Sequence, residues 1–574
     1  MRRLFAWTAA AAFLTACATE GSAPKGAGAV AGGDAAVGGA DAAVGGADAA
    51  VAAADAAVAA DVAASATGPT WFKDVAPLLS SRCVGCHSAK GVGPFPLETY
   101  AEAKAASKLL LGAVKAQRMP PWGAQETAEC KPRFAFKHDL RLSPADIKTL
   151  VDWQLAGAPE GNVADKVDVP KVSFTLANVD VEAKPSAAFV ASGDKDQFRC
   201  FVLDAEFPEQ KFLNGLQFIA GNPQVVHHIL LFSAPAKAAI AKAGSAGSWS
   251  CFGGVGLPDA DFVGGWAPGS VPMEYPADAG APLAKDSRLV MQVHYHPAGT
   301  TAAPDLTRAQ LRFTVGKPKQ WGLAALIGNF NQGKDGEGLL PGPNDPPGKV
   351  EFRIPAGAKG HTETMQFTMP AQFDGNPTPE LSVFGVGTHM HYVGTGMRIE
   401  VLRTPKAACT QTQVTPIQAC AKEKCSEAEG LEALVCASEK CKAELVPLAG
   451  ACGDCLKAGV EAGQTDQVLF NGCLTAKAPD PSQPAHECLV ETPKWDFNWQ
   501  RLYVFDTKVA NLPKVRPGDQ LRFTCTYDNS LDNAFVADVL AEMGLKAPVD
   551  VLLGEETLDE MCLGLLQVLY PAPK

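Results

Sequence analysis

The feature that most constrains the fold is a change of sequence pattern near residue 170. Beyond that point, short apolar alternations are broken by Gly and Pro, which is typical of antiparallel strands; examples are residues 198–203, 225–232, 289–294, 311–315, 381–387 and 521–527. Because 574 residues are too many for one hydrophobic core, two to four domains are expected. The pattern therefore predicts an all-β body made of two sandwiches.

A small all-α domain is expected before this body, over residues 70–165. Apolar residues recur at helical spacing within 75–79, and a second helix is expected at 100–116. Ser143 is followed by Pro144, which predicts the start of a third helix, because Ser caps a helix and Pro fits its first turn.

A second helical stretch, between about 405 and 490, interrupts the β pattern and is interpreted as an insertion. It is rich in Ala, Glu and Lys and holds nine cysteines: Cys409, Cys420, Cys425, Cys436, Cys441, Cys452, Cys455, Cys473 and Cys488. Their spacing suits helices joined by disulfides, with a metal cluster as the alternative. Because nine is odd, one cysteine is expected to pair outside the insertion, and Cys130 is one candidate.

The beginning of the chain predicts export and lipidation. A positive pair, Arg2 and Arg3, precedes an apolar run, and residues 14–17 resemble the lipobox of bacterial lipoproteins. We expect a signal peptide over 1–17 and a lipid anchor on Cys17, which would hold the protein in the bacterial cell envelope, at the outer membrane. An ordinary cleaved signal is the alternative.

Residues 18–69 are interpreted as a flexible linker. They are rich in Ala and Gly, and Asp recurs every seven residues within them. A coiled coil is the structured alternative, but Ala and Val interrupted by glycine pairs bury too little surface to offset chain entropy. The net charge of −12 excludes a nucleic-acid partner, because no basic face is available to neutralise phosphates.

Cys83, Cys86 and His87 form a Cys-x-x-Cys-His motif, the attachment signature of a covalent haem c. A thioredoxin-like redox pair is the alternative. Such a pair would follow a strand, whereas a helix is predicted before this motif. Met119, in an Arg-Met-Pro-Pro-Trp segment, is the candidate sixth iron ligand. A buried core methionine and a ligand role for His138 are the alternatives. The whole segment resembles cytochrome c domains fused to exported bacterial oxidoreductases.

The cysteine count agrees with these interpretations. Without Cys17 and the two thiols of the haem motif, 14 of the 17 cysteines remain, which is an even number. In an exported protein these are expected to form disulfides.

Histidines are sparse, ten in all, and six of them occur as three close pairs: His227 with His228, His294 with His296, and His389 with His391. Residues i and i+2 of a strand share a face, so such a pair can chelate one metal. Adjacent histidines need a local twist or bulge, or different ring nitrogens, to do the same. The alternative is that these histidines are exposed to solvent and bind no metal. Three close pairs on expected strands argue against this alternative.

The segments around these pairs, 224–232, 291–295 and 388–394, resemble the copper-ligand segments of the copper type II, ascorbate-dependent monooxygenases, in the family's order. Asp-Glu-Met-Cys at 559–562 is similar to their methionine segment. The similarity covers about 170–404 and 491–574. It implies two jelly-roll-like copper domains, over 170–310 and 311–574.

The resemblance implies two mononuclear copper sites across a cleft. The first would use His227, His228 and His294, and the second His389, His391 and Met561. The thioether at the second site favours Cu(I), the oxidation state that can bind O₂. The first site has only imidazole ligands, so it suits both oxidation states of copper and can store and pass an electron. Zinc is the rival metal for three histidines, but methionine is a poor zinc ligand. His296 lies on the same face as His294 and could be a substitute ligand, but only His294 matches the family pattern, so His296 is interpreted as a neighbouring or surface residue.

Family disulfides are matched by Cys525 with Cys562 and by Cys200 with Cys251. Two positions depart from the peptidylglycine enzymes: Gly387 replaces an arginine that grips a carboxylate, and Leu565 replaces a tyrosine. A peptide ending in glycine is therefore not the expected substrate.

The resemblance implies hydroxylation of an unactivated C–H bond of a small organic substrate by O₂. The fusion adds the hypothesis that a c-type haem relays electrons from an external donor. The second hypothesis is a lipoprotein that carries haem and copper for electron transfer, or that binds copper, without oxygenase activity. Met561 argues against it, because a storage site has no need of one thioether together with a distant histidine pair. A structural lipoprotein with vestigial sites is the third.

Overall fold

The computed structural model describes residues 68–573, with short gaps at 90–92, 173, 194–195, 253, 268–269, 296–302, 335, 347, 374, 405, 408, 429–430, 446–450, 463, 465, 476, 479–482, 498 and 555–557. The signal peptide with Cys17, nearly all of the linker, and His296 lie outside the described residues. Within the described part of the chain, no helix combines the length and the apolar character needed to cross a membrane.

A group of helices forms the first described region: η1 (Trp71–Val75), α2 (Ala76–Arg82), α3 (Tyr100–Lys115) and α4 (Pro144–Leu155). Ser143 caps α4 and Pro144 is its first residue, which confirms the predicted start. Leu79, Leu110 and Trp153 belong to one buried cluster beneath these helices. The region has its own core, as an independent helical unit requires.

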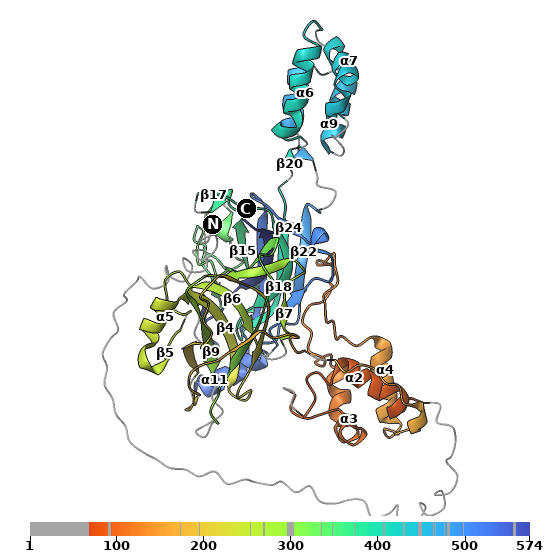
Figure 1. Ribbon diagram of the computed structural model, residues 1–574. Helices are drawn as coiled ribbons and strands as arrows, with labels where there is room; N and C mark the ends of the chain where they lie inside the picture. Colours follow the sequence, from red (N-terminus) through yellow and green to blue (C-terminus); the bar gives the residue numbers. More distant parts are fainter. Residues whose placement is uncertain are drawn as a thin grey trace, which may run out of the picture.

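Three large sheets make up the rest (Figure 1). A five-stranded sheet has the order β5 (Ser248–Ser250), β2 (Gln197–Val202), β9 (Ser287–Tyr295), β4 (Val226–Pro235), β6 (Asp261–Trp266). A six-stranded sheet has the order β12 (Gly333–Lys334), β13 (Glu337–Leu339), β15 (Lys359–Thr368), β25 (Gln520–Asp528), β19 (Gly394–Leu402), β22 (His486–Thr492).

The third sheet has ten strands: in order, β1 (Val181–Ala183), β10 (Arg308–Phe313), β3 (Lys211–Ile219), β8 (Ala279–Leu283), β11 (Gln320–Gly328), β27 (Leu563–Pro571), β18 (Leu381–His389) and β23 (Leu502–Val504), with β7 (Met273–Glu274) on β3 and β24 (Lys514–Val515) on β18. β8 and β11 pair in parallel. The prediction of separate antiparallel sandwiches is therefore incomplete, because one sheet and one apolar core run through both halves.

Smaller elements complete the β body. Two-stranded pairs are formed by β14 (Arg353–Ile354) with β26 (Val551–Leu552), β16 (Gln372–Phe373) with β17 (Asn376–Pro377), and β20 (Lys406–Ala407) with β21 (Lys477–Ala478). The additional helices here are α5 (Ala236–Ala243) and α11 (Ala534–Glu542), and short 3₁₀ turns lie at η3 (Gly244–Ala246) and η4 (Val509–Asn511). A further 3₁₀ turn, η2 (Val163–Asp165), follows α4 and contacts η1 of the helical region.

The predicted helical insertion projects from one end of the sheets (Figure 1). It contains α6 (Gln411–Lys424), α7 (Leu431–Lys440), α8 (Lys442–Leu445), α9 (Ala451–Glu461) and α10 (Asp466–Thr475). Its disulfides join Cys409 to Cys452, Cys420 to Cys441, Cys425 to Cys436 and Cys455 to Cys473. The alternative of a metal cluster on these cysteines is not supported, because a sulfur in a disulfide is not a thiolate ligand.

The ninth cysteine of the insertion, Cys488, pairs with Cys130. Cys200 is bridged to Cys251, and Cys525 to Cys562. Fourteen cysteines thus form seven disulfides, as the even count predicts, and the two thiols left free among the described cysteines are Cys83 and Cys86.

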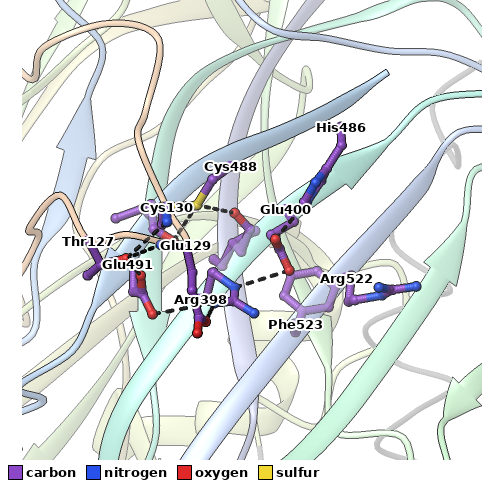
Figure 2. A network of polar contacts seen from close by, with 12 residues as sticks. Thr127, Glu129, Cys130, Arg398, Glu400, His486, Cys488, Glu491, Arg522 and Phe523 are labelled. Atoms are coloured by element: carbon purple, nitrogen blue, oxygen red, sulfur yellow. Dashed lines mark hydrogen bonds and ion pairs between the residues drawn. A yellow bond between two sulfur atoms is a disulfide. The ribbon is translucent and has the colours of Figure 1, made fainter. Parts of the chain in front are cut away.

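The Cys130–Cys488 bridge lies in a polar network that fastens the chain after α3 to the six-stranded sheet (Figure 2). Thr127 donates through its hydroxyl to Glu491 at 2.5 Å, and Arg398 pairs with Glu129. Farther along, residues 135–137 run beside the end of β23, because the Lys137 amide donates to the Val504 carbonyl at 2.8 Å and Phe136 pairs with Phe505. The helical region is thereby held against the β body by a covalent bond and by main-chain hydrogen bonds.

Candidate metal centres

Three histidines meet on neighbouring strands of the five-stranded sheet. His294 lies near the end of β9, and its partner across the ladder is His228 on β4. The register shifts between Val226 and His228, so a bulge lets adjacent His227 and His228 approach one point. A twist or bulge of this kind is needed for two adjacent histidines of a strand to bind one ion.

The ring nitrogens of these histidines have the spacing of a metal site. The three Nδ1 atoms of His227, His228 and His294 lie 3.3 Å from one another in every pair. The centre of such a triangle is about 1.9 Å from each nitrogen, close to the metal–imidazole distance of about 2.0 Å. The donor set therefore fits a copper or zinc ion.

Asp196 orients His294 through the ring nitrogen that does not face the other two histidines. His294 Nε2 lies 2.9 Å from Asp196 Oδ2 and donates to it, which leaves the Nδ1 lone pair for a metal. Phe198 stacks on the same imidazole, with ring centroids 4.2 Å apart. The His294 ring is thus fixed in both tautomer and plane.

Asp196→Asn is expected to weaken copper binding at the three-histidine site by about 10–100-fold, because the carboxylate no longer fixes His294. Competition titration with a copper chelator measures this. Asp278→Asn, at an exposed salt bridge with Lys319, is the matched control and should bind copper like the parent protein. Equal affinities of all three proteins would contradict the role of Asp196.

His389 and His391 lie at the end of β18, with their ring centroids 5.5 Å apart. His389 Nδ1 donates to Gln500 Oε1 at 2.6 Å, and His391 Nδ1 donates to the Asp559 carbonyl at 3.0 Å. Both rings therefore keep Nε2 available for a metal.

Met561 lies in the segment that leads into β27, and this segment runs close to the histidine pair because Leu563 pairs with His389 across β27 and β18. Its side chain is buried, and the neighbouring Glu560 accepts hydrogen bonds from the backbone amides of His391 and Met561. Burial raises the pKa of Glu560 to about 8, against the lowering effect of these amide donors. Glu560 thus joins the two segments that carry His391 and Met561.

Burial favours the neutral form of three of these histidines, namely His228, His389 and His391. Burial lowers the pKa of His391 to about 3 and also lowers that of His389. Burial, followed by the charges of the other histidines, lowers the pKa of His228 well below its ordinary value. Neutral imidazoles are the form that binds metal ions.

An aromatic side chain lies between the two histidine groups. The Phe497 ring stacks on His227 with centroids 4.8 Å apart, and its centroid lies 6.5 Å from that of His391. Tyr392 packs on Phe497 at 4.2 Å. The family resemblance implied a cleft between the two sites, and here the Phe497 ring occupies part of the space between the two histidine groups.

The Cys-x-x-Cys-His motif follows directly after α2. Burial raises the pKa of the Cys83 thiol to about 12, the opposite of the low pKa that a reactive redox pair needs. His87 Nδ1 donates to the Phe95 carbonyl at 2.9 Å, which leaves Nε2 free as a ligand. Met119 is half-buried and precedes Pro120; its role as the sixth ligand stays a prediction, as does the alternative of His138.

The sequence interpretation missed Asp196, Phe497, Gln500 and Glu560. Three of these could have been noticed: Phe497 and Gln500 stand in an aromatic run, Trp-Asp-Phe-Asn-Trp-Gln, directly after the insertion, and Glu560 adjoins Met561. Asp196 stands in an ordinary polar segment and had no local signal.

The comparison with protein families agrees with the first site. Residues 186–301 match the family described as copper type II ascorbate-dependent monooxygenase, N-terminal domain. The matched range contains all three histidines of the triangle. A search of curated proteins finds no match. Residues 186–301 are thus similar to a domain of copper-dependent monooxygenases, a class of oxidoreductases, and this similarity covers the part of the chain that holds the first site.

Proposed function

We propose that this protein is a copper-dependent monooxygenase that hydroxylates an unactivated C–H bond of a small organic substrate with O₂. The observation that carries the proposal is the triangle of Nδ1 atoms within the matched domain. His389, His391 and Met561 would hold a second copper. When bound, copper supplies the redox chemistry with O₂, and the thioether favours Cu(I).

The other residues around the sites position these ligands and exclude water. Asp196 and Gln500 fix the tautomers of His294 and His389. Phe497 and Tyr392 cover the space beside His227 and His391 with apolar surface, which strengthens nearby electrostatic interactions.

A substrate without a terminal carboxylate is favoured. Gly387 and Leu565, the positions that depart from the peptidylglycine enzymes, are direct partners across β18 and β27. Together they offer no cation to pair with a carboxylate, and the side chain of Leu565 is apolar.

The decisive experiment supplies ¹⁸O₂, a reductant and a panel of neutral organic compounds or a metabolite extract to the copper-loaded protein. One ¹⁸O atom per product molecule, found by mass spectrometry, is the expected result. Electron exchange with copper but no ¹⁸O in any product would instead support the electron-transfer alternative, which lacks oxygenase activity.

We further propose that Cys83, Cys86 and His87 carry one covalent haem c that supplies electrons from an external donor, in a protein anchored to the cell envelope through Cys17. The ring orientation of His87, which leaves Nε2 free as an iron ligand, supports haem attachment over a redox pair.

Replacing both Cys83 and Cys86 with Ala is expected to abolish haem staining after denaturing electrophoresis, because the thioether bonds cannot form. Copper content should stay unchanged. Haem that is extracted from the parent protein by acidified acetone would contradict covalent attachment. Loss of the sulfur-to-iron absorption band in Met119→Ala tests the sixth ligand.

A further inference from the structure

A small cavity lies beside the second candidate copper site, under helix α11. Its lining is mostly aliphatic and includes Val536, Val539 and Leu540 of α11, with Val549 and Val551 of the chain that follows. With a volume of about 10 Å³, the cavity has room for about one water molecule. Walls of this kind favour the binding of an apolar molecule.

The same cavity borders both segments that carry candidate ligands of this site. Tyr392, which directly follows His391, lines it, and so does Asp559, which stands two residues before Met561. His391 Nδ1 donates to the Asp559 carbonyl, so the two segments meet at the cavity. A molecule bound there would touch the chain neighbours of ligands on both segments.

Aromatic rings connect the cavity with the space between the two histidine groups. Tyr392 packs on Phe497 with ring centroids 4.2 Å apart, and its ring centroid lies 6.2 Å from that of Phe535 on α11. Phe497 in turn stacks on His227. A series of aromatic rings therefore runs from α11 to the histidines.

The segment that carries α11 is fastened next to the site. It lies between Cys525 and Cys562, which are joined by a disulfide, and Cys562 directly follows Met561. At the start of α11, the Asn533 side chain donates to the Tyr392 carbonyl at 3.0 Å. These attachments hold the helix over the cavity.

The outer boundary of the cavity is an apolar part of the surface. Val549 lines the cavity and is nevertheless 39% exposed, so the cavity lies directly beneath the surface. Met543 and Leu545, just after α11, are 52% and 38% exposed. Exposed large apolar side chains beside a concave site are typical of a place where an apolar ligand enters.

We propose that this cavity is the closed form of a pocket that binds the hydrocarbon part of a neutral, largely apolar substrate, and that α11 is its movable wall. The proposal rests on the proposed function, since it names the substrate class of that reaction. A molecule larger than water must push α11 outward. Gly544, which has a φ of +69° directly after the end of the helix, provides a small terminal residue at which the chain can bend.

Fluorobenzene is the probe, because it is a small apolar ring whose ¹⁹F signal reports binding by nuclear magnetic resonance. It should bind to the full chain, both copper-free and loaded with Cu(II). Para-fluorobenzoate, the same ring with a carboxylate, should bind at least about tenfold more weakly, because its charge would lose hydration in an apolar pocket. No binding of fluorobenzene, or equal binding of the two compounds, would overturn the proposal.

Two changes at Val539 test whether the probe lies in this pocket. Val539→Trp fills the space and should weaken fluorobenzene binding by about tenfold or more. Val539→Thr keeps the volume but adds a hydroxyl, and should weaken binding by about three- to tenfold; it decides the question if the tryptophan variant does not fold. Val315→Trp, at an exposed position after β10, is the matched control and should bind the probe like the parent protein. Unchanged affinity in the folded Val539 variants would refute the pocket.

Copper reports where the bound probe lies. Paramagnetic Cu(II) should broaden the ¹⁹F signal of bound fluorobenzene, and the copper-free protein gives the reference width. Binding without broadening, in protein shown to hold two coppers, would place the probe elsewhere and overturn the proposal. Failure of the proposed function would look different: the Val539 variants would still weaken probe binding, but elemental analysis would find no copper, or ¹⁸O would enter no product.

Discussion

His294→Ala is expected to reduce bound copper from about two ions to about one per chain and to abolish hydroxylation. Even the loss of a group that only orients a ligand costs about 10–100-fold in metal affinity, so the loss of a ligand should cost more. The three Nδ1 atoms are equally spaced, and none of the three histidines can compensate for another. His227→Ala and His228→Ala should therefore give the same result.

Copper and zinc are measured by elemental analysis, and the remaining Cu(II) by its paramagnetic resonance spectrum. His486→Ala is the matched control, because this exposed histidine pairs with Glu400 within the six-stranded sheet, whereas the three-histidine site is on the five-stranded sheet, so the change should leave both coppers in place. Circular dichroism checks that the fold is retained. Full occupancy by zinc, with no exchange for copper, would argue against the copper assignment.

Met561→Leu is expected to lower the rate of O₂-dependent hydroxylation by about two orders of magnitude, while the copper at the three-histidine site remains bound. Leu is chosen because a Met-to-Leu exchange keeps the packing volume and costs less than about 1.5 kcal/mol in a core, whereas Met561→Ala would cost about 2–5 kcal/mol at this buried position. The loss of activity should therefore come from the thioether and not from unfolding.

X-ray absorption of the Cu(I) protein gives a readout apart from activity. A Cu–S contribution should be present in the parent protein and absent in Met561→Leu. Met397→Leu, a change of the same kind at a buried position on β19, should leave that contribution intact. A Cu–S signal that survives in Met561→Leu would place the sulfur ligand elsewhere.

Some of the fold was predictable because it depends on short-range patterns. The cap at Ser143 and the helical insertion between strands both follow from residues close together in the chain. The parallel pairing of β8 with β11 did not follow, because strand partners are chosen by how the two halves bury a shared core. Cys130 was only one candidate partner for an unidentified cysteine of the insertion for a similar reason: the cysteine that it pairs with, Cys488, lies 358 residues away.

The same distinction holds for the sites. The sequence by itself determined the chemistry of the ligands, because a histidine pair on a strand, a Cys-x-x-Cys-His motif and a methionine segment are each legible within a few residues. Only the tertiary structure decided what surrounds them. Gln500 reaches His389 across 111 residues and Asp196 reaches His294 across 98, since strands distant in the chain become neighbours only when the sheets form. Each candidate ligand segment can be read locally, whereas the grouping of these segments and the orientation of their side chains depend on contacts that the folded chain alone creates.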